Sequence, residues 1–143
     1  MMLIDANLLL YARLSSFPEH DRARVWLDEQ LNGPAPVGLA WPSLVSFVRI
    51  SINPRVFDRP LTVATAWKQV REWLACGSVW TPVPTDLHAH VLGRFMMDGS
   101  MTPNLVGDAH LAALAVEHGL VLCSADGDFA RFEGVRWINP LTQ

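Results

Sequence analysis

The sequence predicts an α/β fold in which helices flank a central, mainly parallel β-sheet as a three-layer sandwich. Short apolar runs of strand length alternate with longer segments whose apolar residues recur every three or four positions. This alternation is typical of βαβ units with right-handed crossovers. Residues 120–123 are apolar throughout, as in a parallel strand that is buried on both faces. The 143 residues show no repeat or linker, so we expect one domain spanning residues 1–143.

The first half of the chain is expected to contain two strands and three helices. Ser16 and Glu19 have the spacing of a capping box, which predicts the start of a helix. Pro42 suits the first turn of another helix, because its missing N–H has no partner there anyway. The expected elements are a strand at residues 2–5, helices at 6–14 and about 16–31, a strand at 37–40 and a helix at 43–53.

The second half is expected to continue the same alternation. Thr62 can cap a helix whose apolar residues, among them Trp67 and Trp73, lie at helical spacing and are expected in the core. Thr85 is the expected cap of the next helix, and Gly119 is expected to end the last one. The expected elements are a helix at about residues 62–76, a strand at 79–81, a helix from about 85, a helix at 108–118 and strands at 120–123 and 135–138.

Composition excludes several classes of protein. Hydrophobic residues make up 50% of the chain and charged residues 17%, which excludes a disordered chain. No apolar run reaches the length of a membrane span, so no membrane partner is expected. Cys76 and Cys123 match no disulfide or zinc spacing, which favours the reducing cytoplasm. A net charge of −3 argues against a broad basic surface for nucleic acid.

Three carboxylates are expected at one edge of the sheet. Asp5 ends the first strand, Asp126 follows the strand at residues 120–123, and Asp108 begins the helix that precedes that strand. In open parallel sheets the reactive crevice lies outside the carboxyl ends of the strands. Each residue alone has an ordinary alternative as a helix cap or turn residue. Their joint placement is harder to explain in that way, because like charges close together repel.

A bound cation would relieve this repulsion. Ligation by carboxylate oxygens suits a hard ion, so the sequence favours Mg²⁺, with Mn²⁺ as a substitute, over zinc or copper. Asp126-Gly-Asp128 begins like a calcium loop, but the later positions of that loop do not match. His88, His90 and His110 are expected to be surface or packing residues rather than metal ligands.

Several short segments resemble one known family. Ile4-Asp-Ala-Asn7 is similar to the opening motif of the PIN domain, and residues 104–115 resemble the helix that carries its third acid. The segment Leu122-Cys-Ser-Ala-Asp-Gly-Asp-Phe129 resembles its T/S-x-D-x-D-F motif. Asn53-Pro-Arg-Val-Phe57 and Arg136-Trp-Ile-Asn-Pro140 resemble one branch of its VapC-type ribonuclease toxins. The likeness runs through essentially the whole chain.

The resemblance implies a PIN-like fold and metal-dependent cleavage of RNA. Asp5, Asp108 and Asp126 would be the catalytic residues and the ligands of Mg²⁺. Asn7 and Ser124 would be auxiliary polar groups, and Asp128 a possible fourth acid. The resemblance further implies a cytoplasmic toxin of a type II toxin–antitoxin system, a homodimer that is inhibited by a cognate VapB-like antitoxin. The expected substrate is a structured RNA such as tRNA, because its single-stranded loops present accessible bases.

One position departs from the family pattern. Most members carry a Glu on the third helix where this chain has Ser46, and a neutral hydroxyl is a poor ligand beside carboxylates. We therefore expect weak metal affinity, and Asp98 is a possible compensating acid. Arg49 and Arg55, after the same helix, are candidates for RNA contacts, since Arg binds phosphate bidentately. Two alternatives stay open: a catalytically weak module that binds RNA or protein, and a structure-specific DNA nuclease.

Overall fold

The computed structural model describes residues 1–142 and contains one five-stranded, fully parallel sheet. The strand order is β3-β2-β1-β4-β5, and β1 pairs with β2 on one side and with β4 on the other. The strand order therefore reverses between β1 and β4, the position where open parallel sheets form their crevice. The strands are β1 Met2–Ile4, β2 Val37–Gly38, β3 Val79–Trp80, β4 Val121–Cys123 and β5 Arg136–Ile138.

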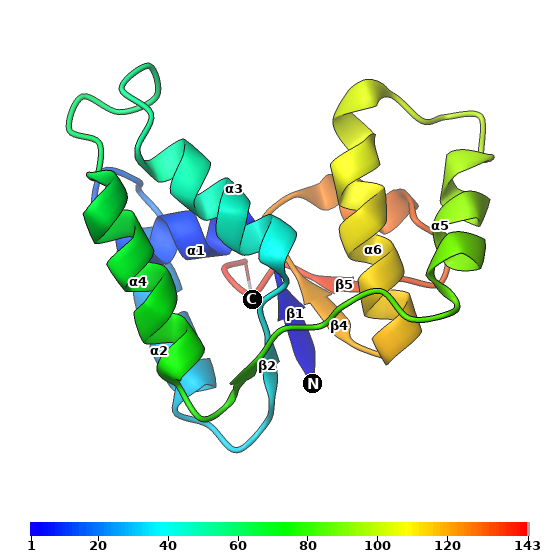
Figure 1. The fold of residues 1–143 in the computed structure, drawn as a ribbon, viewed down its shortest axis with the longest axis horizontal. Helices are drawn as coiled ribbons and strands as arrows, with labels where there is room; N and C mark the ends of the chain where they lie inside the picture. Colours follow the sequence, from blue (N-terminus) through cyan, green and yellow to red (C-terminus); the bar gives the residue numbers. More distant parts are fainter. Residues whose placement is uncertain (143) are drawn as a thin grey trace.

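Six α-helices cover the two faces of this sheet (Figure 1). Helices α1 to α4 lie on one side of the strands, and α5 and α6 lie on the other. The helices are α1 Ala6–Arg13, α2 His20–Leu31, α3 Trp41–Ser51, α4 Val63–Ala75, α5 His88–Met96 and α6 Val106–His118, with short 3-10 turns η1 Pro103–Leu105 and η2 Gly127–Arg131. The predicted α/β sandwich with a parallel sheet is confirmed.

The sheet separates two apolar cores. Ile4 and Cys123 pack into the core beneath α1 to α4, whereas Leu3 and Leu122 pack beneath α5 and α6. This division follows from the strand itself, because successive side chains point to opposite faces. All four residues are fully buried, and each aliphatic side chain contributes about 1.5–3 kcal/mol by leaving water. The central strands β1 and β4 are thereby fixed side by side.

The helix boundaries agree with the predictions except at some starts. Thr62 caps α4, its Oγ1 accepting from Thr65 N at 3.1 Å. The predicted capping box at Ser16 and Glu19 is wrong, since α2 begins at His20 and its start has no side-chain cap. Phe17 instead packs edge-on against the Tyr11 ring, and this contact holds residues 14–19 in a turn.

The prediction of a buried Trp67 is also wrong. Its side chain is 46% exposed on α4, whereas Trp73 on the same helix is 6% exposed and belongs to the core as expected. Trp67 stacks on Trp41 of α3, with ring centroids 6.4 Å apart. Within residues 1–142, no helix combines the length and the apolar character needed to cross a bilayer.

Candidate active site

Asp5 stands at the point where β1 ends and α1 begins. Its backbone N–H donates to Cys123 O at 3.0 Å, which continues the pairing of β1 with β4 to the end of the sheet. Its side chain caps α1, with Oδ1 accepting from Ala6 N at 2.7 Å. The other oxygen, Oδ2, accepts from Ser124 Oγ at 2.8 Å. The carboxylate is thus held by the start of α1 and by the residue that follows β4.

Ser124 is the hub of a hydrogen-bond network between the two strand ends. Its hydroxyl is fully buried, donates to Asp5 and accepts from Asn7 Nδ2 at 3.1 Å and Asp126 N at 3.0 Å. The side-chain oxygen Oδ1 of Asn7 in turn accepts from Ala125 N at 3.3 Å. The residues named as auxiliary, Asn7 and Ser124, therefore orient the segments that carry Asp5 and Asp126.

Asp126 and Asp128 lie on the loop that follows β4. Asp126 caps the turn η2, with Oδ1 accepting from Asp128 N at 2.9 Å. Asp128 is exposed and lies in the first turn of η2. Asp126 therefore has the ordinary role of an Asp that caps a turn. Its carboxylate also lies at the carboxyl-terminal edge of the sheet, which we call the rim, and the two roles are compatible because a carboxylate oxygen has further lone pairs for other partners.

Asp108 reaches the same rim from the first turn of α6. The helix begins at Val106, two residues before the predicted start, so Asp108 is not its cap. The pKa of Asp108 is raised to about 6, chiefly by burial and in addition by the charges of Asp5, Asp126 and Asp128. Burial also raises the pKa of Asp5, with the Ser124 hydrogen bond opposing and the Asp126 charge adding to the shift. The four acids therefore share one electrostatic environment.

The rim has the electrostatics of a cation site without the closed geometry of one. Over residues 1–142 the ion pairs are Lys68–Glu72 and a pair between His88 and Glu117, so no basic side chain neutralises the rim acids. The donor set is all oxygen, which fits a hard divalent ion. In the same part of the chain, however, no three His, Cys, Asp or Glu side chains lie close enough to hold one ion together.

The other predicted site residues lie around this rim or away from it. Ser46 is partly buried on α3, while Arg49 at the end of α3 and Arg55 in the following loop are exposed. Asp98 is exposed beyond α5 and is not among the charges that shift the pKa of Asp5 or Asp108. It therefore gives no sign of replacing the missing Glu.

The chain matches a known family model over almost its full length. The PIN domain model matches residues 2–135. The chain is 46% identical over 140 residues to Ribonuclease VapC37 of Mycobacterium tuberculosis, covering 98% of this chain and 97% of that protein. It is 36% identical over 143 residues to Ribonuclease VapC33 of the same species, with full coverage of both.

This protein belongs to the VapC family of PIN-domain proteins. Solved structures support the same fold for this VapC-family chain. One is the crystal structure of VapC20 of Mycobacterium tuberculosis, described as a toxin that cleaves the sarcin-ricin loop. Its TM-score is 0.65 at 21% sequence identity, and the match covers 95% of this chain and 99% of that one. VapBC2 from Rickettsia felis, bound to a promoter DNA fragment, has a TM-score of 0.68 at 13% identity, with coverage of 96% and 97%.

Two aromatic residues of this VapC-family protein adjoin the site and were not predicted from sequence. The Trp137 indole N–H donates to Ser124 O at 3.0 Å, so the edge strand β5 helps to fix the hub. The phenol of Tyr11 has a raised pKa through burial and the charges of Glu19, Asp126 and Asp5. Trp137 lies in the segment Arg136-Trp-Ile-Asn-Pro140, and the resemblance of this segment to the VapC-type toxins could have pointed to Trp137. Tyr11 carries no such signal, because its approach to Asp126 depends on the packing of distant segments.

The histidines of the VapC-family chain form a separate network between α5 and α6. His88 Nδ1 pairs with Glu117 Oε2 at 2.5 Å, and its Nε2 lies 3.0 Å from His110 Nδ1. Glu117 also accepts from Thr85 N and Thr85 Oγ1, and the predicted cap at Thr85 is wrong because α5 begins at His88, so that Thr85 Oγ1 instead accepts from Leu87 N in the turn before the helix. His88 and His110 are therefore packing residues that join two helices, as predicted, while His90 is exposed.

Proposed function

We propose that this protein is the toxin component of a type II toxin–antitoxin system and a Mg²⁺-dependent endoribonuclease. The observation that carries the proposal is the set of carboxylates at the carboxyl ends of β1 and β4, with no basic side chain paired to them among residues 1–142. Such a site repels the phosphate of RNA unless a cation is present. Relatives named as ribonucleases, at 36–46% identity over the full length, support the same reaction class.

Asp5, Asp108 and Asp126 are the proposed ligands, with Asp128 as a further acid. A bound divalent ion supplies charge neutralisation at the scissile phosphate and lowers the pKa of a water molecule. Manganese is the expected substitute, since it prefers the same oxygen donors. Each oxygen of the Asp5 carboxylate accepts one hydrogen bond, from Ala6 N and from Ser124 Oγ, and the remaining lone pairs would be available to the ion.

The chain's own residues prepare the site in two ways. Ser124 and Ala6 hold the Asp5 carboxylate against rotation, so its orientation is set before substrate arrives. Asp108, with its pKa near 6, gives up its proton more readily when a cation offsets the charges of the other acids. Metal binding and deprotonation of Asp108 are therefore coupled, and both favour neutral over acidic pH.

Ser46 bears on the strength of metal binding. It supplies a neutral hydroxyl at the position where most of the family has a carboxylate, so fewer negative charges face the ion. We propose weak metal affinity and a need for high Mg²⁺ or Mn²⁺ concentrations. A module that binds RNA without cutting it is the alternative that this substitution favours.

A structured RNA such as tRNA is the proposed substrate. Single-stranded loops expose bases and phosphates that a duplex hides, which suits an enzyme that must reach one phosphodiester. The solved relative VapC20 is titled a toxin that cleaves the sarcin-ricin loop, which is consistent with a structured target. We place the activity in the cytoplasm, where such RNA is found and where the free thiols of Cys76 and Cys123 stay reduced.

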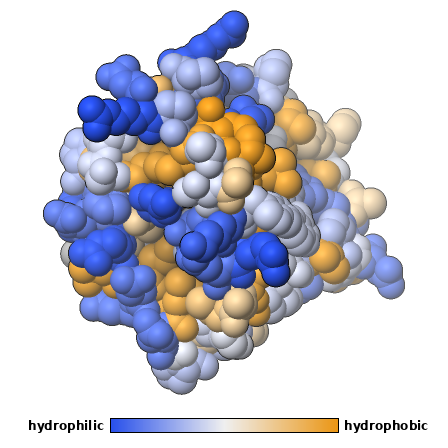
Figure 2. Space-filling view, turned by 60° about the vertical axis from the view of Figure 1, so that its left-hand side comes forward, coloured by the Kyte–Doolittle hydropathy of each residue, from blue (hydrophilic) through white to orange (hydrophobic). Residues whose placement is uncertain are grey.

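An exposed apolar face supports protein partners. Trp41 and Trp67 stack at the surface with 41% and 46% of their areas exposed, beside Val45 at 59% and Val63 at 61%. Helices α2 and α4 come forward in Figure 2, where apolar surface gathers between charged side chains. Apolar clusters of this kind mark interaction sites. We propose that a VapB-like antitoxin binds at this face, and toxin–antitoxin complexes among the structural relatives support an antitoxin partner. We also propose that the protein is a homodimer.

The test is incubation of the purified chain with total RNA in Mg²⁺, Mn²⁺ or EDTA. We expect cleavage with either metal, none in EDTA, and none by the variants Asp5→Asn and Asp126→Asn. Asp86→Asn is the matched control, because Asp86 is an exposed carboxylate between β3 and α5. Cleavage that persists in EDTA or in both site variants contradicts the proposal. RNA binding without cleavage under every condition supports the binding module, and faster cleavage of a branched DNA supports the DNA nuclease.

A further inference from the structure

A groove lies at the far end of α1 from the acidic rim. A groove of about 650 Å³ is bounded by the end of α1, the turn that follows it and the loop at residues 56–61. Phe17 and Phe57 line it, both partly exposed, with ring centroids 5.6 Å apart. The Tyr11 ring lies 4.8 Å from Phe17, so three aromatic rings form a continuous row.

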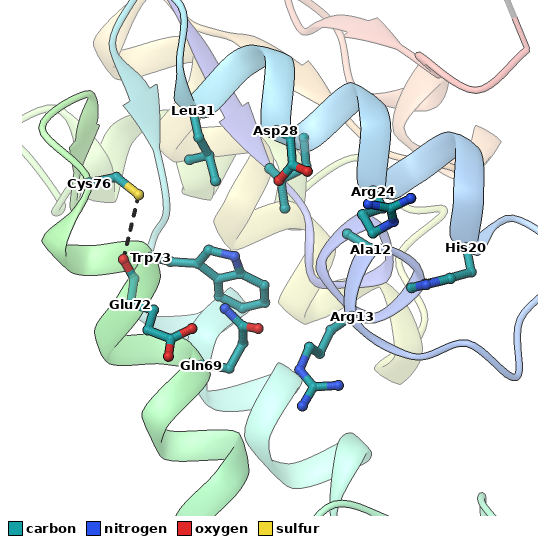
Figure 3. A pocket seen from close by; sticks show the side chains of 11 residues that line it. Ala12, Arg13, His20, Arg24, Asp28, Leu31, Gln69, Glu72, Trp73 and Cys76 are labelled. Atoms are coloured by element: carbon teal, nitrogen blue, oxygen red, sulfur yellow. Dashed lines mark hydrogen bonds between the residues drawn. The ribbon is translucent and has the colours of Figure 1, made fainter.

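The groove is also cationic and rich in hydroxyls. Arg13 and Arg59 line it with a single acid, Asp58, and neither arginine takes part in an ion pair within residues 1–142. Ser15 and Ser16 add exposed hydroxyl groups. Arg13 also lines a neighbouring hollow, where Figure 3 shows its side chain projecting away from α1 and Leu31 and Cys76 at the opposite end.

Helix α1 connects this groove to the acidic rim, because Asp5 caps its start and Arg13 lies in its last turn. Tyr11 lies on the same helix between them, and its pKa is raised first by burial and then by the charges of Glu19, Asp126 and Asp5. Helix α1 has eight residues, so the rim at its start and Arg13 at its end lie roughly 12 Å apart along the helix. A chain that enters the rim can therefore continue along Tyr11 and Phe17 to the arginines.

We propose that this groove binds the single-stranded flank of the RNA whose phosphodiester lies at the acidic rim. Unpaired bases stack on aromatic rings, and arginine forks bind the phosphates between them, as in other sites for single strands. The inference rests on the proposed ribonuclease function for the position of the scissile phosphate. The lining favours RNA over a protein occupant, because it combines two arginines and one acid with two aromatic rings, and a single strand offers both phosphates and bases to such a surface. The proposal assigns the RNA contacts to Arg13 and Arg59 in place of Arg49 and Arg55, which do not line the groove.

The test measures binding of a fluorescein-labelled, unstructured RNA of about twelve nucleotides, a length within the range of single-strand sites. Fluorescence anisotropy of the full-length protein is recorded in EDTA, so that no cleavage occurs, over a series of salt concentrations. The variant Arg13→Gln/Arg59→Gln is compared with Arg71→Gln/Arg94→Gln, which removes the same charge from exposed positions on α4 and α5.

We expect the groove variant to lose two phosphate contacts. Because each contact to a single strand contributes about 0.7 to the slope of log affinity against log salt, the slope should fall by about 1.4. The control variant should match the native protein. Phe57→Leu should weaken binding about fivefold or more without changing the salt slope, since stacking on the ring is lost while the charges stay. Thermal unfolding shows whether Phe57→Leu is folded. Tyr11→Phe, which keeps the aromatic ring and removes only the hydroxyl, is unfolded in the same way for comparison.

The outcomes separate this inference from the proposed function. If the groove variant binds the RNA with native affinity and slope, the inference is wrong, whether or not the native protein cleaves RNA. If the same variant loses affinity for the cognate antitoxin and keeps its affinity for RNA, the groove is a protein docking surface and the inference is again wrong. If RNA binding falls as expected while no metal restores cleavage, the groove is supported and the nuclease proposal fails.

Discussion

The hydroxyl of Ser124 should contribute strongly to stability, and Ser124→Ala tests this. The substitution removes one hydrogen bond to the Asp5 carboxylate and takes the acceptor from the Asn7 amide and the Asp126 N–H, two partly buried donors beside the fully buried Ser124. A hydrogen bond to a charged group contributes about 1.5–3 kcal/mol, and each buried donor left unpaired costs about 1–3 kcal/mol. Because Asn7 and Asp126 are partly exposed, water replaces much of their lost bonding and the full cost of two unpaired donors does not apply, so we expect a loss of about 2–4 kcal/mol in the free energy of unfolding, mainly from the bond to Asp5.

The pH dependence of this loss identifies its cause. Ser124 lowers the pKa of Asp5 against the raising effect of burial, so its hydrogen bond favours the ionised carboxylate. The loss should therefore be greatest at pH values above the raised pKa of Asp5, and smaller in acid, where that carboxyl is protonated. Urea unfolding at neutral and acidic pH, in EDTA, measures both values. Ser15→Ala is the control, since Ser15 is exposed and forms none of these bonds. A loss below about 0.5 kcal/mol at neutral pH, the range of ordinary surface substitutions, would refute the reasoning.

Three further predictions concern the acids and one helix end. Because the pKa of Asp108 is raised from its ordinary value of 3.8 to about 6 in the folded protein, its ionisation costs stability progressively as the pH rises between these two values, so Asp108→Asn should raise Tm in EDTA at pH 7.5 and leave it nearly unchanged at about pH 3, where the acid is largely protonated in both states. An equal effect at both values contradicts this cause. Ser46→Glu should tighten Mn²⁺ binding in a calorimetric titration, and an unchanged titration would mean that Ser46 does not face the ion. Gly119→Ala should cost roughly 1–2 kcal/mol in chemical unfolding, because φ is 66° at this left-handed end of α6; a neutral effect would contradict it.

The sheet was predictable because its signals are local. Each strand is a short apolar run, and each long helix has a face of apolar residues, so the alternation and the parallel topology follow from periodicity alone. The ends of helices were less predictable. Ser16 and Glu19 have the spacing of a cap, yet the contact of Phe17 with Tyr11 holds that segment in a turn. Trp67 has helical spacing with the core residues but lies at the edge of the apolar stripe, where it stacks on Trp41.

The site was predictable to the extent that strand ends determine it. Asp5 and the loop with Asp126 adjoin because β1 pairs with β4, and pairing in a parallel sheet brings the carboxyl ends of strands to one rim. The roles of Trp137 and Tyr11 depend on contacts between residues distant in sequence, which periodicity does not report. The same is true of Glu117, whose burial between α5 and α6 follows from its bonds to Thr85 and His88.

The acidic composition acquires a different meaning once the charges are placed. The net charge of −3 includes the rim acids, and removing Asp5, Asp108 and Asp126 leaves −3 + 3 = 0 for the rest of the chain. The rim repels phosphate without a cation, while Arg13 and Arg59 attract it at the other end of α1. Binding of the RNA flank and positioning of the scissile phosphate are thus assigned to different charges. It follows that EDTA should abolish cleavage while leaving most of the affinity for single-stranded RNA, a combination that a purely metal-dependent mode of binding does not produce.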